Sequence, residues 1–207
     1  MNKKEAILTS ALQLFHTKGY AGTSLRMIAE RARVNVAHIS YYFQNKQGLL
    51  EYCFALYYEE YIDILERAVK IAEERSAKEA LLKLIEEVLG FHRAHNPLAR
   101  FVLREMTIDS QIVREVLSTY VMRERYYLKT LLEIGMEQGE YETVSTRYCI
   151  IQLKSLLTMP YLQAQYMSEV WQVHPQDPYF EKQYKRELFH LVNETLFTKQ
   201  RLATAHL

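Results

Sequence analysis

Apolar residues recur every three or four positions along almost the whole chain, which is the period of an α-helix with one buried face. Residues 23–46, TSLRMIAERARVNVAHISYYFQNK, are the clearest short example and indicate two short helices joined by a tight polar turn. The buried sides of these two helices are marked by apolar residues at helical spacing: Leu25, Ile28, Ala29 and Ala32, then Val36, Ile39 and Phe43. Thr23 or Ser24 can cap the first helix and Asn35 the second, because their side-chain oxygens accept free amides at a helix start.

The outward face of the second short helix is small, polar and aromatic, and consists of Ala37, His38, Ser40 and Tyr41. A helix that reads DNA in the major groove needs such a face, with groups for phosphates and base edges. The spacing fits a helix-turn-helix that binds DNA, and it equally fits a helical hairpin inside an ordinary all-α core.

Charge favours the DNA-binding interpretation. Residues 1–50 contain seven Lys or Arg and two Asp or Glu, which gives a net charge of +5. Residues 51–207 contain nineteen Lys or Arg and twenty-three Asp or Glu, which gives a net charge of −4. A basic segment joined to an acidic remainder is expected if only the first fifty residues meet phosphates.

The same periodicity predicts further helices at about residues 3–18, 46–74, 76–95, 97–105, 110–139, 143–159, 161–172 and 179–199. Asp109 or Ser110 is expected to cap the helix that ends near Gly139. Pro160 is expected to end or kink the helix at about residues 143–159, since proline has no amide donor. With six glycines and four prolines in 207 residues, there is little room for β-turns. We therefore expect an all-α fold, with a three-helix helix-turn-helix head at residues 1–47 and a larger helical body at residues 48–207.

Several classes of protein are disfavoured by what the sequence lacks. It has no run of the roughly 18–20 apolar residues needed to span a membrane and no signal-peptide core at its start, so we expect a cytoplasmic, nucleoid-associated protein. Cys53 and Cys149 have no metal or redox spacing. Without a Ser/His/Asp set or a glycine-rich phosphate loop, we expect no enzyme, metal site or cofactor.

Residues Ile7 to Leu50 resemble the DNA-binding domain of the TetR family of bacterial transcriptional regulators. The resemblance is carried by a long set of spaced residues: Ala11, Leu14, Phe15, Gly19, Tyr20, Thr23, Ser24, Ile28, Ala29, Ala32, Val34, Ile39, Tyr41, Tyr42, Phe43, Lys46, Leu49 and Leu50. It implies that Tyr41 and Lys46 contact phosphates and that Val36, Ala37 and His38 face base edges. The expected DNA-binding residues are Ser24, Arg26, Arg33, Asn35, Val36, Ala37, His38, Ser40, Tyr41 and Lys46.

Two positions depart from the family pattern. Arg33 stands in the turn where the family usually has glycine, and a side chain in a left-handed conformation costs roughly 1–2 kcal/mol. Either the turn differs locally, or the strain is accepted and Arg33 adds a phosphate contact. Ser40 stands where the family often has tyrosine, which weakens or removes a phosphate contact there.

Binding as a pair is expected, because one recognition helix reads only a few base pairs and a twofold homodimer suits palindromic double-stranded DNA. By the resemblance, the last two long helices form the dimer interface, for which the candidates are Ile150, Leu153, Leu157, Tyr184, Leu188, Leu191, Val192 and Thr195. The alternative is that these stripes face the core of their own subunit.

Two further surfaces are candidates for binding. Arg93, Arg100, Arg104 and Arg114 cluster around Pro97 in an otherwise acidic region, either as a solvated face or as a docking surface for an acidic protein. Many family members bind a small-molecule effector in a pocket among their middle helices. The residues that could line such a pocket here are Tyr58, His92, Met106, Tyr120, Tyr126 and Trp171. Ordinary core packing accounts for these side chains as well, and no ligand class is indicated.

Residues 100–110 and 153–166, together with Asn35 to Ile39, resemble a branch of this family that regulates cell division in spore-forming bacilli. The resemblance implies a DNA-bound dimer that acts on the tubulin-like division protein FtsZ, with the arginine cluster as the candidate contact. The alternative function is that of a repressor released from DNA by a small molecule.

Overall fold

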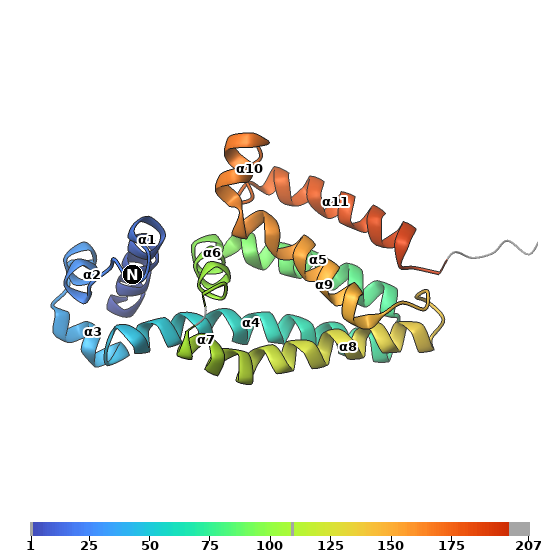
Figure 1. The fold of residues 1–207 in the computed structure, drawn as a ribbon, viewed down its shortest axis with the longest axis horizontal. Coiled ribbons are helices and arrows are strands. Elements are labelled where there is room, and N and C mark those ends of the chain that lie inside the picture. Colours follow the sequence, from blue (N-terminus) through green and yellow to red (C-terminus); the bar gives the residue numbers. More distant parts are fainter. Residues whose placement is uncertain (1, 109, 199–207) are drawn as a thin grey trace, which may run out of the picture. The chain divides into compact units, whose positions relative to one another are not determined.

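The computed structural model describes residues 2–108 and 110–198, and this part of the chain is almost entirely helical (Figure 1). The helices are α1 (Lys3–Lys18), α2 (Leu25–Ala32), α3 (Val36–Phe43), α4 (Lys46–Glu74), α5 (Ala77–Ala94), α6 (Asn96–Glu105), α7 (Gln111–Val116), α8 (Met122–Glu137), α9 (Thr146–Leu162), α10 (Ala164–Val170) and α11 (Pro178–Thr195). A π-helical turn, η1 (Leu117–Val121), joins α7 to α8. Among the described residues, extended pairing is limited to one isolated antiparallel bridge between Tyr141 and Phe197, and the all-α prediction is confirmed.

The chain forms two compact units, and α4 contributes to both. The N-terminal unit contains residues 1–61 and 95–120, and the C-terminal unit contains residues 62–94 and 121–207. The first unit therefore includes more than residues 1–47, since α6 and α7 also belong to it.

In the N-terminal unit, α1 packs against α2, α3 and α6. Ile7, Ile28 and Ile39 are fully buried between the first three helices, as the apolar spacing predicts. The Phe15 ring of α1 stacks on the Phe101 ring of α6 with centroids 4.7 Å apart. This stack makes α6 part of the support of the first three helices.

In the C-terminal unit, α5 packs against α8, α9 and α11. Leu81, Ile85 and Leu89 of α5 are completely buried among these neighbours. His92 is buried with them; its Nδ1 lies 3.3 Å from the carbonyl oxygen of Leu157, and burial lowers its pKa to about 4. A neutral imidazole that donates to this carbonyl explains how the ring fits into an apolar core.

Pro160 does not end α9, which continues to Leu162. Proline cannot donate to the carbonyl of Leu156 one turn earlier, so that oxygen would lack its helical partner. The hydroxyl of Tyr184 in α11 donates to this same oxygen at 2.8 Å. The contact from α11 thus supplies the missing hydrogen bond, which no pattern within α9 could predict.

The segment predicted as one helix from residue 110 to 139 is divided into α7, η1 and α8. Ser110 accepts a hydrogen bond from the amide of Val113 at 3.3 Å, whereas the alternative cap, Asp109, lies outside the described residues. The last helix ends at Thr195, and its expected end at Lys199 also falls outside them. Within the part of the chain that is described, no helix has the length and apolar character that a membrane span requires.

Candidate DNA-binding site

The helix-turn-helix is built by side-chain caps on both of its helices. Ser24 Oγ accepts from the amide of Met27 at 3.3 Å at the start of α2, and Asn35 Oδ1 accepts from the amide of Ala37 at 2.8 Å at the start of α3. Each oxygen satisfies an amide that has no partner inside its helix. Ser24 rather than Thr23 is the first cap, and the predicted cap at Asn35 is confirmed.

Arg33 ends α2 in the left-handed conformation, with φ 54° and ψ 45°. Its amide bonds to the carbonyl of Glu30, and the amide of Val34 bonds to that of Ala29, which closes the turn. Of the two alternatives for this position, the chain therefore accepts the strain. The Arg33 side chain is exposed and can meet a phosphate.

Helix α3 buries Ile39 and Phe43 and turns a narrow face outward. Ala37, Ser40 and Tyr41 are exposed on that face, and the Tyr41 side chain is 81% accessible. The Tyr41 ring meets the Tyr42 ring edge-on with centroids 5.0 Å apart and otherwise stays open, and its hydroxyl can donate to a phosphate oxygen.

The other predicted DNA-binding residues divide into two groups by exposure. The exposed residues of this set are Ser24, Arg26, Arg33 and Asn35. The half-buried ones are Val36, His38 and Lys46. All of them lie in the N-terminal unit, around α2, α3 and the start of α4.

Lys46 is turned toward its own chain. Its ammonium lies 4.2 Å from the centroid of the Tyr20 ring and donates to the carbonyl oxygen of Ala21 at 3.5 Å. Burial lowers the pKa of Lys46, an effect that the carboxylate of Glu105 opposes. The phosphate contact expected of Lys46 remains a prediction.

His38 also contacts its own chain. The Lys3 ammonium lies 3.2 Å from His38 Nε2, and among the described residues His38 Nδ1 is buried without a hydrogen-bond partner. Lys3 is separated from His38 by 35 positions, so no local pattern could have included it in the site.

The four arginines proposed as one partner surface differ in unit, exposure and contacts. Arg93 lies in the C-terminal unit and forms an ion pair with Glu181 of α11. Arg104 donates to the carbonyl oxygen of Phe15 at 2.7 Å, so its guanidinium is used to hold α1. Arg100 is half-buried, and Arg114 is exposed on α7.

Arg100 and Arg104 affect the same neighbour on α1. Burial lowers the pKa of His16, and the positive charges of Arg100 and then Arg104 lower it further. Burial likewise lowers the pKa of Arg100, with an added contribution from Arg104. These effects place both guanidinium groups beside α1, which accounts for part of the arginine cluster without a partner protein.

The residues suggested for an effector pocket are spread over both units. Tyr58 is buried in the N-terminal unit and stacks on Tyr120 at 5.3 Å, while Tyr126 and Trp171 are exposed. His92 is held in the core of the C-terminal unit, and Met106 is half-buried at the end of α6. The six side chains therefore belong to different units and differ in exposure.

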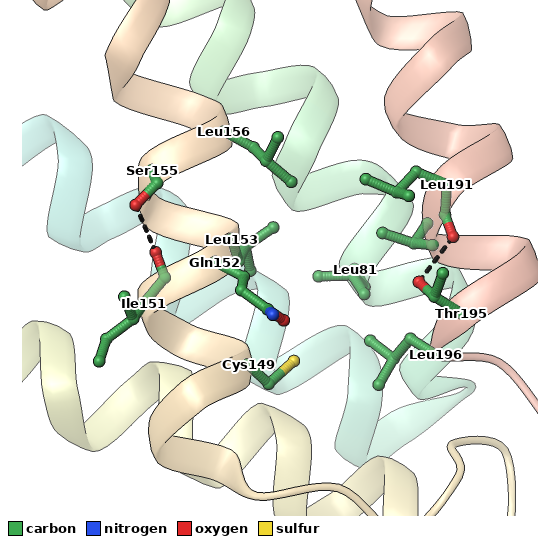
Figure 2. Close-up of a pocket in the computed structure, with 11 residues that line it drawn as sticks. Leu81, Cys149, Ile151, Gln152, Leu153, Ser155, Leu156, Leu191, Thr195 and Leu196 are labelled. Carbon is green, nitrogen blue, oxygen red and sulfur yellow. Dashed lines mark hydrogen bonds between the residues drawn. The ribbon is translucent and has the colours of Figure 1, made fainter.

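The C-terminal unit has a groove of about 540 Å³ between α9 and α11 (Figure 2). Leu156 of α9 and Leu191 of α11 point toward each other across it, and Leu81 of α5 lies between them. Ile151 and Ser155 point away from α11 on the outer side of α9. The groove is mostly apolar and open to solvent on the surface of a single chain.

Burial corrects the predicted dimer stripe. Leu153, Leu157, Leu188 and Val192 are buried in the protomer's own core, and the Tyr184 hydroxyl serves Leu156 as described above. Ile150 is half-buried, whereas Leu191 and Thr195 are exposed. The apolar side chains left open on α9 are displaced from the predicted stripe and include Tyr148, Ile151 and Met159. Spacing alone could not separate the inward face from the outward one, because both faces of α9 carry apolar residues.

Comparison with known proteins agrees with this architecture. The model for the bacterial regulatory proteins of the tetR family matches residues 7–53. The probable HTH-type transcriptional regulator YttP of Bacillus subtilis is 48% identical over 188 residues, which cover 91% of each chain.

Two solved structures show the same fold. PfmR from Thermus thermophilus, a TetR family transcriptional regulator, superposes with a TM-score of 0.76 at 20% identity, over 91% of this chain and 97% of that one. FadR from Bacillus subtilis, solved in complex with stearoyl-CoA, has a TM-score of 0.65 at 19% identity, over 90% and 97%. The chain belongs to the tetR family of bacterial transcriptional regulators.

Proposed function

We propose that the protein binds palindromic double-stranded DNA as a homodimer and acts as a regulator from the DNA site that it occupies. The observation that carries this proposal is the exposed face of α3, which presents Ala37, Ser40 and Tyr41 on a helix capped at its start and supported by a buried core. A narrow face of this kind fits the major groove, and its hydroxyls suit phosphates and base edges.

The electrostatics of the N-terminal unit support the same proposal. Arg26 and Arg33 are exposed near α3, in a stretch of fifty residues with a net charge of +5. Arg26 stands in the first turns of α2, and Arg33 in the turn between the helices. Exposed cations in the helix that precedes a recognition helix, and in the turn that leads to it, are suited to the phosphates that border a groove.

The open surface of α9 and α11 supports dimerisation. Leu191, which borders the groove shown in Figure 2, is 39% exposed, and Ile151, on the outer side of α9, is 56% exposed. A second copy that inserts apolar side chains there would remove this surface from water, and a twofold pair presents two recognition helices to a palindrome.

The test compares two matched substitutions. Ala37→Glu places a carboxylate on the exposed face of α3, where it would meet DNA phosphates, while Ala94→Glu adds the same charge to an exposed position at the end of α5. We expect Ala37→Glu to abolish binding to a site recovered by selection from random DNA, and Ala94→Glu to bind as the parent does. Equal affinity of all three proteins would refute the use of α3.

We further propose a role in cell division, in which the DNA-bound dimer modulates assembly of FtsZ as the regulator RefZ does. This proposal is supported by the resemblance of residues 100–110 and 153–166 to that regulator. Within the arginine cluster we take Arg114 as the candidate contact, because its side chain is exposed on α7.

Mapping of bound sites across the chromosome separates the division role from ordinary repression. Sites clustered around the replication origin and away from promoters are expected for a division regulator, whereas a single site at its own or a neighbouring promoter is expected for a repressor. Arg114→Glu should weaken the effect on FtsZ while leaving DNA binding intact. An unchanged effect on FtsZ would remove Arg114 from the contact surface.

The alternative, a repressor released by a small molecule, has one structural candidate. FadR of Bacillus subtilis was solved with stearoyl-CoA, and the groove between α9 and α11 here is apolar. Dimerisation through the same groove would compete with such a ligand. A saturated acyl-CoA that dissociates the protein from its DNA site would favour this alternative over the division role.

A further inference from the structure

The start of α1 lies beside α3 and is closed by a capping box. Asn2 Oδ1 accepts from the amide of Lys4 at 3.2 Å, and the Glu5 carboxylate accepts from the amide of Asn2 at 3.1 Å, which forms a complete capping box. From the first turn of this helix, the Lys3 side chain reaches His38 on α3, with 3.2 Å between Lys3 Nζ and His38 Nε2. The two helices are therefore joined at the face proposed to meet DNA.

The chemistry of this contact fixes the state of the His38 ring. An ammonium group can only donate, so His38 Nε2 accepts, the imidazole is neutral, and its proton is on Nδ1. That Nδ1–H is buried and has no acceptor among the described residues. A buried donor without a partner opposes folding, so stability does not explain why a histidine stands at this position.

Lys3 differs from its neighbour Lys4 in what holds its charge. The Lys4 ammonium lies 4.1 Å from the centroid of the Tyr52 ring and 5.8 Å from that of Phe43, where the two aromatic faces attract it. Lys3 is exposed, and its ammonium contacts a neutral ring. Its full positive charge therefore remains available at the side of α3.

We propose that Lys3 is a DNA-contacting residue that neutralises a backbone phosphate beside the groove entered by α3. His38 is its positioning residue, because the ring holds the ammonium in place instead of reading a base edge. This inference rests on the proposed DNA-binding function and adds the start of α1 to the DNA-binding surface. It assigns to His38 a role different from the base contact implied by the family resemblance.

Salt dependence of DNA affinity tests the phosphate contact. Each neutralised phosphate contributes about 0.9 to the slope of log affinity against log salt, so Lys3→Ala should lower the slope by about 1.8 for a dimer. The ratio of the DNA affinity of the parent protein to that of Lys3→Ala should then fall about sevenfold between about 50 and about 150 mM salt. Lys70→Ala, which removes an exposed charge from the C-terminal half of α4, is the matched control and should keep the parent slope.

The positioning role of His38 is tested on the same palindromic duplex and on a shuffled duplex of equal length. Removing a neutral side chain takes away no charge, yet His38→Ala should lower the salt slope on both duplexes toward that of Lys3→Ala. His38→Gln retains an acceptor and should restore the slope, and the double variant should lose no more than Lys3→Ala alone. If His38→Ala does not fold, His38→Leu, which has no acceptor, replaces it.

The outcomes separate this inference from the function on which it rests. A parent protein that binds neither duplex refutes the proposed function itself. A parent that binds, with an unchanged slope in Lys3→Ala, refutes the phosphate contact. An unchanged slope in His38→Ala, with affinity lost only on the palindrome, shows that His38 reads a base and overturns the positioning role.

Discussion

Replacement of Arg33 by glycine should stabilise the protein and weaken its binding to DNA. Arg33 has φ 54° and ψ 45°, a conformation that costs an L-residue roughly 1–2 kcal/mol. Glycine removes this cost, but its greater freedom in the unfolded chain lowers the free energy of unfolding by about 0.4–1 kcal/mol. At the midpoints of these ranges the expected gain is about 0.8 kcal/mol, which for a domain of this size raises Tm by about 2–3 °C.

Arg33→Ala is the control that separates strain from charge. Alanine loses the guanidinium but keeps a Cβ in the left-handed conformation, so thermal unfolding should show stabilisation by glycine and none by alanine. Both variants lose one cation near the phosphates, so both should show the same weaker DNA affinity and smaller salt slope. If glycine and alanine give equal Tm values, left-handed strain at Arg33 does not limit stability.

Three further predictions concern the C-terminal unit. Leu191→Arg should give a folded monomer that binds palindromic DNA weakly, because it would bury a charge in the proposed interface, and sedimentation and DNA titration measure the two effects. The control, Met122→Arg on the exposed side of α8, should stay dimeric. A dimeric Leu191→Arg would exclude this part of α11 from the interface. Tyr184→Phe should cost about 1–3 kcal/mol in urea unfolding, because the Leu156 carbonyl beside Pro160 loses its donor; an unchanged midpoint would show that this hydrogen bond is not needed. His92 has a pKa lowered to about 4 when folded against 6.5 in its reference state, so the unfolded chain binds more protons between these values and stability falls as pH drops through that range. His92→Gln should flatten this dependence of Tm on pH, and an equally steep profile would assign the dependence to other groups.

The N-terminal helices could be predicted closely because local signals determine them. Helices α1, α3 and α4 begin and end where the sequence indicates, since Asn35 caps α3 and Gly19, with φ 72°, follows α1. The αL geometry of Arg33 could be anticipated only from the family resemblance, because no propensity favours arginine there.

Features that depend on contacts between distant residues could not be predicted. The continuation of α9 through Pro160 requires Tyr184 from another helix, and the engagement of His38 requires Lys3, 35 positions away. For the dimer surface, apolar residues on more than one side of α9 make helical periodicity ambiguous. In the single chain Leu153 and Leu157 are buried and Ile151 is exposed, which identifies the inward face of α9, while the dimer surface stays a prediction.

The central claim is that α3 reads DNA twice, once from each subunit of a twofold pair. Selection from random-sequence DNA followed by measurement of the mass of the complex tests it most directly. We expect an inverted repeat whose half-sites are about one helical turn apart, roughly 34–36 Å, bound by two chains per duplex and poorly by one half-site. Recovery of no common sequence, or tight binding of a single chain to one half-site, would contradict the account.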